Sequence, residues 1–223
     1  MKILAFDTAT EYCSAALWLD GDVLERSALA GRTHSQLLLP QCQSLLAETE
    51  MNLGQLDGIA FGMGPGSFTG LRIGCAVAQG LAFAAGLPVI GISSLQAMAA
   101  SSGGDKALVC LDARMEEVYH AVYARQSETW VELRAPAVCR PELVPYPAGE
   151  GWTGCGSGFA TYAEVLLSRF GESLSGVVAD CYPYAGQIAQ LAAGQFEQGN
   201  GYAAELAAPL YIRNKVALKI CER

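Results

Sequence analysis

The sequence contains few of the residues from which metal and acid–base centres are usually built. Only two of its 223 residues are histidine, His34 and His120, and neither has a second ligand at metal-binding spacing. Neither belongs to a recognisable nucleophile–base pair. The eight cysteines are scattered about thirty residues apart, mostly in apolar runs, which favours buried free thiols. The sequence therefore predicts no metal site and no catalytic residue.

Charged residues are also scarce, and basic residues are fewer than acidic ones. Charged residues make up 16% of the chain and hydrophobic residues 52%, and the net charge is −8. An acidic surface repels phosphate backbones, which argues against an extended direct contact with nucleic acid. A solvated helix end and an RNA contact both remain open for the one basic cluster, which comprises Arg213, Lys215, Lys219 and Arg223.

No signal peptide and no membrane span is expected. Asp7 interrupts the N-terminal apolar run, unlike the core of a signal peptide. Residues 73–90 carry no charge, but a helix over 71–86 is about 24 Å long, which falls short of the ~30 Å bilayer core. Together with the reduced cysteines, this pattern predicts a cytoplasmic protein without membrane contact.

Apolar periodicity and turn residues predict a duplicated arrangement of elements. In the first half, strands are expected at 2–6, 14–19, 23–29, 58–62 and 89–91, and helices at 35–48 and 71–86. In the second half, strands are expected at 107–112, 118–123 and 130–138, and helices at 158–169 and 184–196. Each half opens with three strands, which predicts two related α/β lobes, 1–103 and 104–223. The last helix of the second lobe could pack back on the first.

Asp7, Thr8 and Thr10 directly follow the first predicted strand. Hydroxyl and backbone N–H groups at such a turn bind phosphate, and an aspartate there holds a hydrated magnesium ion. An Asp/Thr turn that satisfies its own backbone explains the same residues. The sequence leaves both interpretations open.

A glycine-rich turn precedes the helix at 71–86. Ser67 or Thr69 would cap this helix, whose free N–H groups form an anion site. A glycine-rich cap without a ligand fits equally well. The residues of the turn are Gly64, Pro65, Gly66, Ser67, Thr69 and Gly70.

Small residues recur every four positions along the helix at 71–86, and the row comprises Gly70, Gly74, Ala78, Ala82 and Gly86. Such a row makes a shallow groove that accepts another helix. Close packing on the chain's own sheet explains the row too. This helix is apolar on nearly every side, however, and its second face needs a cover such as a partner helix.

Four stretches together resemble the TsaB (YeaZ) family: Ile3–Thr10, Gly64–Gly74, Leu111–Tyr119 and Pro209–Ala217. The resemblance implies two related lobes of the actin, sugar-kinase and Hsp70 (ASKHA) type, which is an RNase H-like fold. It also implies a non-catalytic scaffold that works with the paralogue TsaD and the ATPase TsaE. Their shared product is N6-threonylcarbamoyladenosine at the tRNA position next to the anticodon, and this chain would reach tRNA only through the complex.

The resemblance also implies that chemistry belongs to TsaD, whose metal is held by a pair of histidines on one helix. Ser94 and Met98 occupy the matching positions here, and a hydroxyl and a thioether cannot replace two imidazoles. The loop at Asp7 lacks the glycine of active ATPases of this fold. We therefore expect no cofactor bound by this chain alone, and ATP or ADP only at the assembled complex.

In the family, the two helices of the first lobe pair with TsaD, and the same surface can form a homodimer. The implied interface residues are Leu38, Cys42, Leu45, Leu71, Gly74, Ala78 and Ala82. A peptidase and a small-molecule kinase of the same fold remain the alternative functions.

Overall fold

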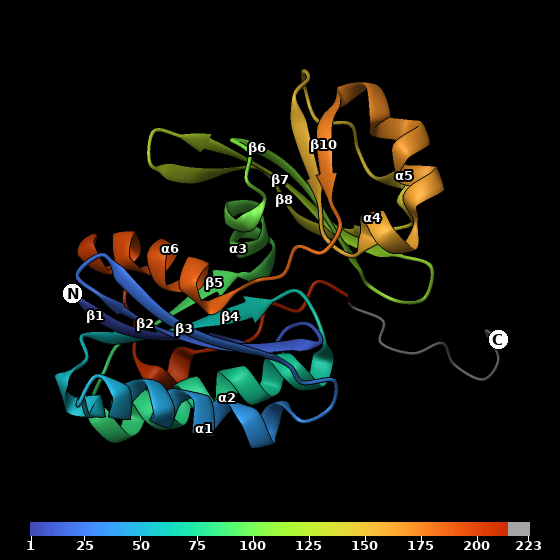
Figure 1. Cartoon of the computed structure of the whole chain (residues 1–223). Helices are drawn as coiled ribbons and strands as arrows, with labels where there is room; N and C mark the ends of the chain where they lie inside the picture. Colours follow the sequence, from blue (N-terminus) through green and yellow to red (C-terminus); the bar gives the residue numbers. More distant parts are fainter. Residues whose placement is uncertain (214–223) are drawn as a thin grey trace.

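Two five-stranded sheets organise the chain, and the computed structural model describes residues 1–213 (Figure 1). The first sheet contains β1 (Lys2–Asp7), β2 (Tyr12–Leu19), β3 (Asp22–Leu29), β4 (Gly58–Gly64) and β5 (Val89–Ser93). The second contains β6 (Lys106–Asp112), β7 (Val118–Gln126), β8 (Thr129–Cys139), β9 (Trp152–Cys155) and β10 (Leu174–Val178). The helices are α1 (His34–Glu48), α2 (Phe68–Ala85), α3 (Ser94–Ser101), α4 (Gly158–Thr161), α5 (Ala163–Phe170) and α6 (Ala185–Glu197). The basic tail residues Lys215, Lys219 and Arg223 lie outside the described residues.

Both sheets have the same topology when strands are counted within each half. The first has the order β3-β2-β1-β4-β5, and the second, read from its other edge, has the order β8-β7-β6-β9-β10. In each sheet the first three strands pair antiparallel, and the fourth and fifth continue in parallel from the first. The prediction of two related α/β units is therefore confirmed.

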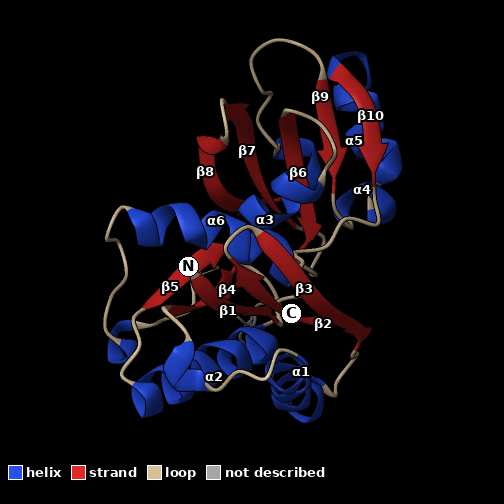
Figure 2. Cartoon of the chain, turned by 60° about the vertical axis from the view of Figure 1, so that its left-hand side comes forward, coloured by secondary structure: helices blue, strands red, loops and turns tan. Residues whose placement is uncertain are grey.

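The last helix of each half crosses to the sheet of the other half (Figure 2). Helix α3 follows β5 but packs on the second sheet, where Leu95 and Met98 join its core. Helix α6 follows β10 but packs on the first sheet, where Ile188 joins its core. The two helices also contact each other between the sheets. In space, therefore, the first lobe includes α6 from the second half of the sequence.

Three elements escaped the sequence prediction: α3, β9 and β10. Strands β9 and β10 have only four and five residues, too few to establish an alternating pattern. The predicted helix at 158–169 is divided at Tyr162, whose φ of −121° and ψ of 35° are not helical. The other predicted strands and helices are present with bounds shifted by a few residues.

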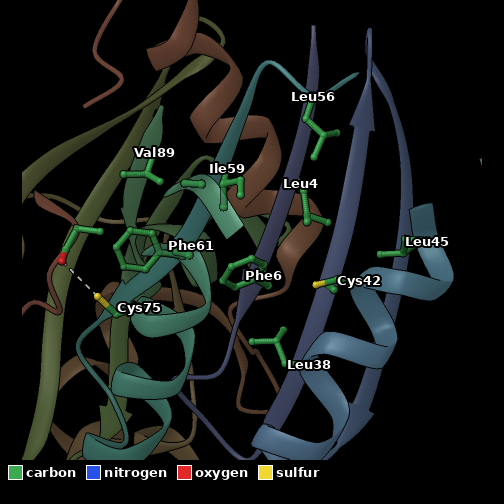
Figure 3. Close-up of a cluster of buried hydrophobic side chains, with 14 of the residues drawn as sticks. Leu4, Phe6, Leu38, Cys42, Leu45, Leu56, Ile59, Phe61, Cys75 and Val89 are labelled. Carbon is green, nitrogen blue, oxygen red and sulfur yellow. Dashed lines mark hydrogen bonds between the residues drawn. The ribbon is translucent and has the colours of Figure 1, made fainter. Parts of the chain in front are cut away.

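The main core of the first lobe lies between the first sheet and the layer formed by α1 and α2 (Figure 3). Along β1, Leu4 and Phe6 face this core, whereas Ile3 and Ala5 face α6. This alternation is the consequence of the two-residue period of a strand that is buried on both faces. Burial of each large apolar side chain stabilises the fold by about 1.5–3 kcal/mol relative to exposure.

The small-residue row of α2 faces this same core, which corrects the predicted interface. Gly70, Gly74, Ala78 and Ala82 are buried on the inner side of the helix, where their size permits close approach to the chain's own sheet and loops. A Cβ added to Gly74 would lie 2.7 Å from the Thr8 Oγ1 atom. All seven predicted interface residues are buried within the chain and do not face outward: Leu38, Cys42, Leu45, Leu71, Gly74, Ala78 and Ala82.

Helix α2 is also long and apolar enough, by length and composition alone, to cross a membrane. Its inner side, however, packs on the first sheet as one layer of the lobe (Figure 1). A third of the helix is buried in this way, and a single helix that passes the test of length and composition is weak evidence for a membrane span.

Candidate functional site

The two stretches considered for phosphate binding are packed directly against each other. The Ser67 N–H donates to the Ala9 carbonyl at 2.7 Å, and the Thr8 hydroxyl donates to the Gly70 carbonyl at 2.7 Å. A Cβ added to Gly70 would lie 1.9 Å from the Thr8 carbonyl oxygen, and one added to Gly66 would lie 2.3 Å from that of Ala9. The glycines therefore permit close contact between two loops of the chain itself.

Asp7 lies beneath these loops and is only 2% exposed. Its Oδ1 accepts a hydrogen bond from the Ala9 N–H at 2.7 Å, and its Oδ2 accepts one from the Ser94 hydroxyl at 2.9 Å. Removal from water raises the pKa of Asp7 to about 7, although both hydrogen bonds favour its ionised form. A Cβ added to Gly62 would lie 1.7 Å from Oδ2, so the carboxyl group is enclosed by the fold.

A cavity of about 870 Å³ lies between the two lobes. The start of α2 and the loop after β1 line it from the first lobe, and the loop after β6 lines it from the second. Of the three residues predicted at the first loop, only Thr10 lines the cavity. From the glycine-rich turn, Pro65, Gly66 and Ser67 line it, whereas Gly64, Thr69 and Gly70 do not.

The start of α2 presents a positive and aromatic surface to this cavity. The Ser67 hydroxyl accepts from the Gly70 N–H at 3.3 Å, so Ser67 is the cap of the two candidates. The Arg72 guanidinium lies 3.6 Å from the centre of the Phe68 ring, and its Nε donates to the Tyr211 hydroxyl at 2.9 Å. A helix start with an adjacent arginine favours an anionic group.

Ser94 and Met98, the two positions at which the resemblance implies the metal ligands of TsaD, both make structural contacts. Ser94 is fully buried and donates to Asp7, and the Met98 side chain is fully buried in the core of the second sheet. The Met98 carbonyl accepts a hydrogen bond from the Cys181 thiol at 3.2 Å. Among residues 1–213 there is no group of three or more histidine, cysteine, aspartate or glutamate side chains placed to hold a metal ion.

The outer face of α2 is apolar and exposed. We define it by Ala76, Gly80, Phe83 and Ala84, which point away from the sheet, and the Phe83 side chain is 80% exposed. No charged residue lies between positions 73 and 90. Helix α1 lies beside α2 in the same layer and exposes Leu39 (Figure 2). A large exposed aromatic side chain on the uncharged part of a helix, after Arg72, favours an interaction surface.

Sequence reasoning missed one group of cleft residues, the segment Leu210–Arg213. Tyr211 and Arg213 line the cavity together with Arg114 and Tyr119 of the second lobe. The only sequence signal for them was their position in the last of the four stretches that resemble the TsaB family. Nothing in the local pattern indicates that residues so late in the chain return to the start of α2.

Comparison with known proteins gives consistent results. The chain matches the model of a family described as TsaD, tRNA N6-adenosine threonylcarbamoyltransferase, over residues 27–215. It is 41% identical to the tRNA threonylcarbamoyladenosine biosynthesis protein TsaB of Escherichia coli K12, over 98% of this chain and 97% of that protein. The Haemophilus influenzae TsaB is 37% identical, over 98% of this chain and 96% of that protein.

Two solved structures from Pseudomonas aeruginosa have the same fold. One, named YeaZ, superposes with a TM-score of 0.88 at 38% identity, over 94% of this chain and 99% of that chain. The other has the same TM-score and identity and covers 95% of this chain and 99% of that chain. It is described as an uncharacterized protein with similarity to the peptidase YeaZ.

Proposed function

Because the chain belongs to the TsaB family, we propose that it acts in tRNA threonylcarbamoyladenosine biosynthesis as a non-catalytic, partner-binding subunit. Its partners are TsaD and TsaE, and the modified position is the adenosine next to the anticodon. The net charge of −8 favours an indirect route to tRNA through the complex. The chain works in the cytoplasm.

The observation that carries this proposal is the outer face of α2. Phe83 is 80% exposed on a helix whose last turns have no charge. Burial of such a side chain in an interface contributes about 1.5–3 kcal/mol. The chain itself matches the TsaD family model over residues 27–215. Two proteins of one fold can pair through equivalent helices, so TsaD is the proposed occupant and a second copy of this chain competes for the same face.

The contacts of Asp7, Ser94 and Met98 support the non-catalytic part. The Ser94 hydroxyl donates a hydrogen bond to the Asp7 carboxylate in a buried site, and the Met98 side chain packs in the core of the second sheet. A serine hydroxyl and a thioether are poor ligands for the metals that imidazole pairs hold. The chemistry is therefore assigned to TsaD.

The packing of the two glycine-containing loops supports the absence of independent nucleotide binding. The Ser67 N–H, one of the backbone donors at the start of α2, is already bonded to the Ala9 carbonyl. We therefore propose that ATP or ADP binds only at the assembled complex, where TsaE and TsaD contribute the remaining contacts.

Reconstitution tests this proposal. Purified chain alone is expected to release no phosphate from ATP. In the presence of TsaD, TsaE, tRNA, ATP and threonylcarbamoyl-adenylate as the acyl donor, it is expected to support modification, measured by mass spectrometry of the nucleosides. The variant Phe83→Glu should abolish modification. Leu143→Glu is the matched control, because Leu143 is a 66% exposed apolar residue of the second lobe. ATP turnover by the chain alone at kinase-like rates would contradict the proposal.

The peptidase alternative has one specific support, the description of a Pseudomonas aeruginosa relative as similar to a peptidase. Incubation of the chain with purified TsaD distinguishes the two functions. The scaffold proposal predicts that TsaD remains intact over hours, and its cleavage at a defined bond would favour the peptidase.

A further inference from the structure

The last described residues, Leu210–Arg213, connect the two lobes across the cleft, and we call them the strap. Their first half is bound to the first lobe. The Leu210 N–H donates to the Met63 carbonyl on β4 at 2.7 Å. The Tyr211 hydroxyl accepts from the Arg72 Nε atom, and the Tyr211 ring lies 5.9 Å from the Phe68 ring. Both contacts lie at the start of α2, beside the cavity.

The second half of the strap is bound to the second lobe through Arg213. Its Nη2 donates to the Glu117 carboxylate at 2.5 Å and to the Arg114 carbonyl at 3.4 Å. The guanidinium also lies 5.8 Å from the centre of the Tyr119 ring. The Arg213 side chain is 15% exposed and that of Glu117 is 33% exposed, so solvent screens this pair less than a surface ion pair.

The loop that receives Arg213 has an unfavourable backbone conformation. Arg114, Met115 and Glu116 have φ angles of 59°, 56° and 59°, in the left-handed region that residues with a side chain rarely occupy. Two backbone hydrogen bonds close this loop, from the Ala113 N–H to the Glu117 carbonyl and from the Glu117 N–H to the Arg114 carbonyl. Such a conformation persists only where surrounding contacts impose it. Arg213 supplies three of them, to the Arg114 carbonyl, the Met115 sulfur and the Glu117 carboxylate.

We propose that the strap is a latch that holds the two lobes closed over the cleft. The contacts of Arg213 with the second lobe are the ones that break when the latch opens. The chain itself crosses between the sheets twice, through α3 and through the segment before α6. The strap adds a non-covalent bridge at the cavity, which it also lines. A ligand or partner segment that binds in the cavity contacts the strap, which lines it. Release of Arg213 would let the loop at 114–116 relax. This device does not depend on the scaffold function.

Hydrogen exchange on the full chain, followed by mass spectrometry, tests the latch. The reporters are the amides of Ala113, Glu117 and Leu210, whose acceptors are given above. In Arg213→Met, which keeps the apolar stem and removes the charge, their exchange should accelerate about tenfold, the factor expected when charge-assisted hydrogen bonds are lost. Peptides from α1 should exchange as in the unmodified chain. Arg125→Met is the control, since it removes exposed ion pairs with Asp105 and Glu128 in the same lobe.

Glu117→Gln removes the charge of the other partner in the ion pair with Arg213, so exchange of the same three amides should accelerate. The double variant Arg213→Glu with Glu117→Arg restores the opposite charges and should slow exchange again relative to either single change. Exchange at the three amides that is unchanged in both Arg213→Met and Glu117→Gln would overturn the proposal. So would a uniform acceleration across the whole chain, because it would indicate general destabilisation without a latch.

Discussion

Replacement of Asp7 by asparagine tests the interpretation of this residue as an enclosed structural group. Asparagine has nearly the same shape, and its Oδ1 can accept from the Ala9 N–H as the carboxylate does. Its amide group can donate to the Ser94 hydroxyl, which needs only to rotate. The variant therefore keeps both hydrogen bonds and removes the ionisable proton.

The magnitude follows from the pKa of Asp7, which burial raises from 3.8 to about 7. Because the folded state holds the proton more tightly than the unfolded state, the contribution to stability is complete below about pH 4. It is lost as the pH rises through about 7. The full difference corresponds to about 4 kcal/mol, of which about 2–3 kcal/mol is lost between pH 5 and pH 8. The group is fully enclosed, so no correction for solvent screening is needed.

Urea unfolding followed by circular dichroism at pH 5 and pH 8 measures this loss. The free energy of unfolding of the unmodified chain should fall more steeply over this interval than that of Asp7→Asn, by about 2–3 kcal/mol. Asp105→Asn is the matched control, since the Asp105 side chain is 81% exposed, and its pH profile should follow that of the unmodified chain. Parallel profiles for Asp7→Asn and the unmodified chain would refute the raised pKa of the enclosed Asp7 carboxyl.

Two further substitutions test the packing that positions the cleft. Gly70→Ala places a Cβ 1.9 Å from the Thr8 carbonyl oxygen, so the two loops must separate, and the melting temperature should fall by several degrees in a thermal scan. An unchanged melting temperature would contradict the close contact. Leu38→Ala removes a fully buried side chain between α1 and the first sheet and should lower the free energy of unfolding by about 2–5 kcal/mol in urea titrations. A loss below about 1 kcal/mol would contradict the inward orientation of Leu38.

Local pattern was sufficient to predict the layered architecture. The three antiparallel strands that open each half are long enough to show their period, and the helices at α1 and α2 are marked by clear apolar spacing. These opening strands were the basis for predicting two related units, whereas the order of the strands in each sheet comes from the structure. Short strands such as β9 were not predicted, because four residues are too few to show an alternating pattern.

The orientation of α2 could not be predicted, because a helix that is apolar on nearly every side has no polar stripe to mark its outer face. The row of small residues on α2 was predicted to contact a partner helix. In the structure, the loop at Thr8 and the first sheet pack against that side of the helix. Phe83, the most exposed of the large hydrophobic side chains, lies on the opposite side.

Long-range contacts at the site were also beyond local reasoning. Asp7 accepts a hydrogen bond from Ser94, which lies 87 positions later in the sequence. At the start of α2, Arg72 donates a hydrogen bond to Tyr211, which lies 139 positions later. Only the folded chain brings these residues together. The motif around Asp7 therefore indicated a turn after the first strand, but it did not show which later residues contact that turn.

The affinity of the chain for TsaD measures the central claim most directly. Titration calorimetry with the unmodified chain, Phe83→Glu and Leu143→Glu compares an outer-face residue of α2, 80% exposed, with an apolar residue of the second lobe that is 66% exposed. A buried carboxylate without a partner is costly, so the account predicts that Phe83→Glu weakens binding by at least about tenfold while Leu143→Glu binds like the unmodified chain. Equal affinity of all three proteins for TsaD would contradict it.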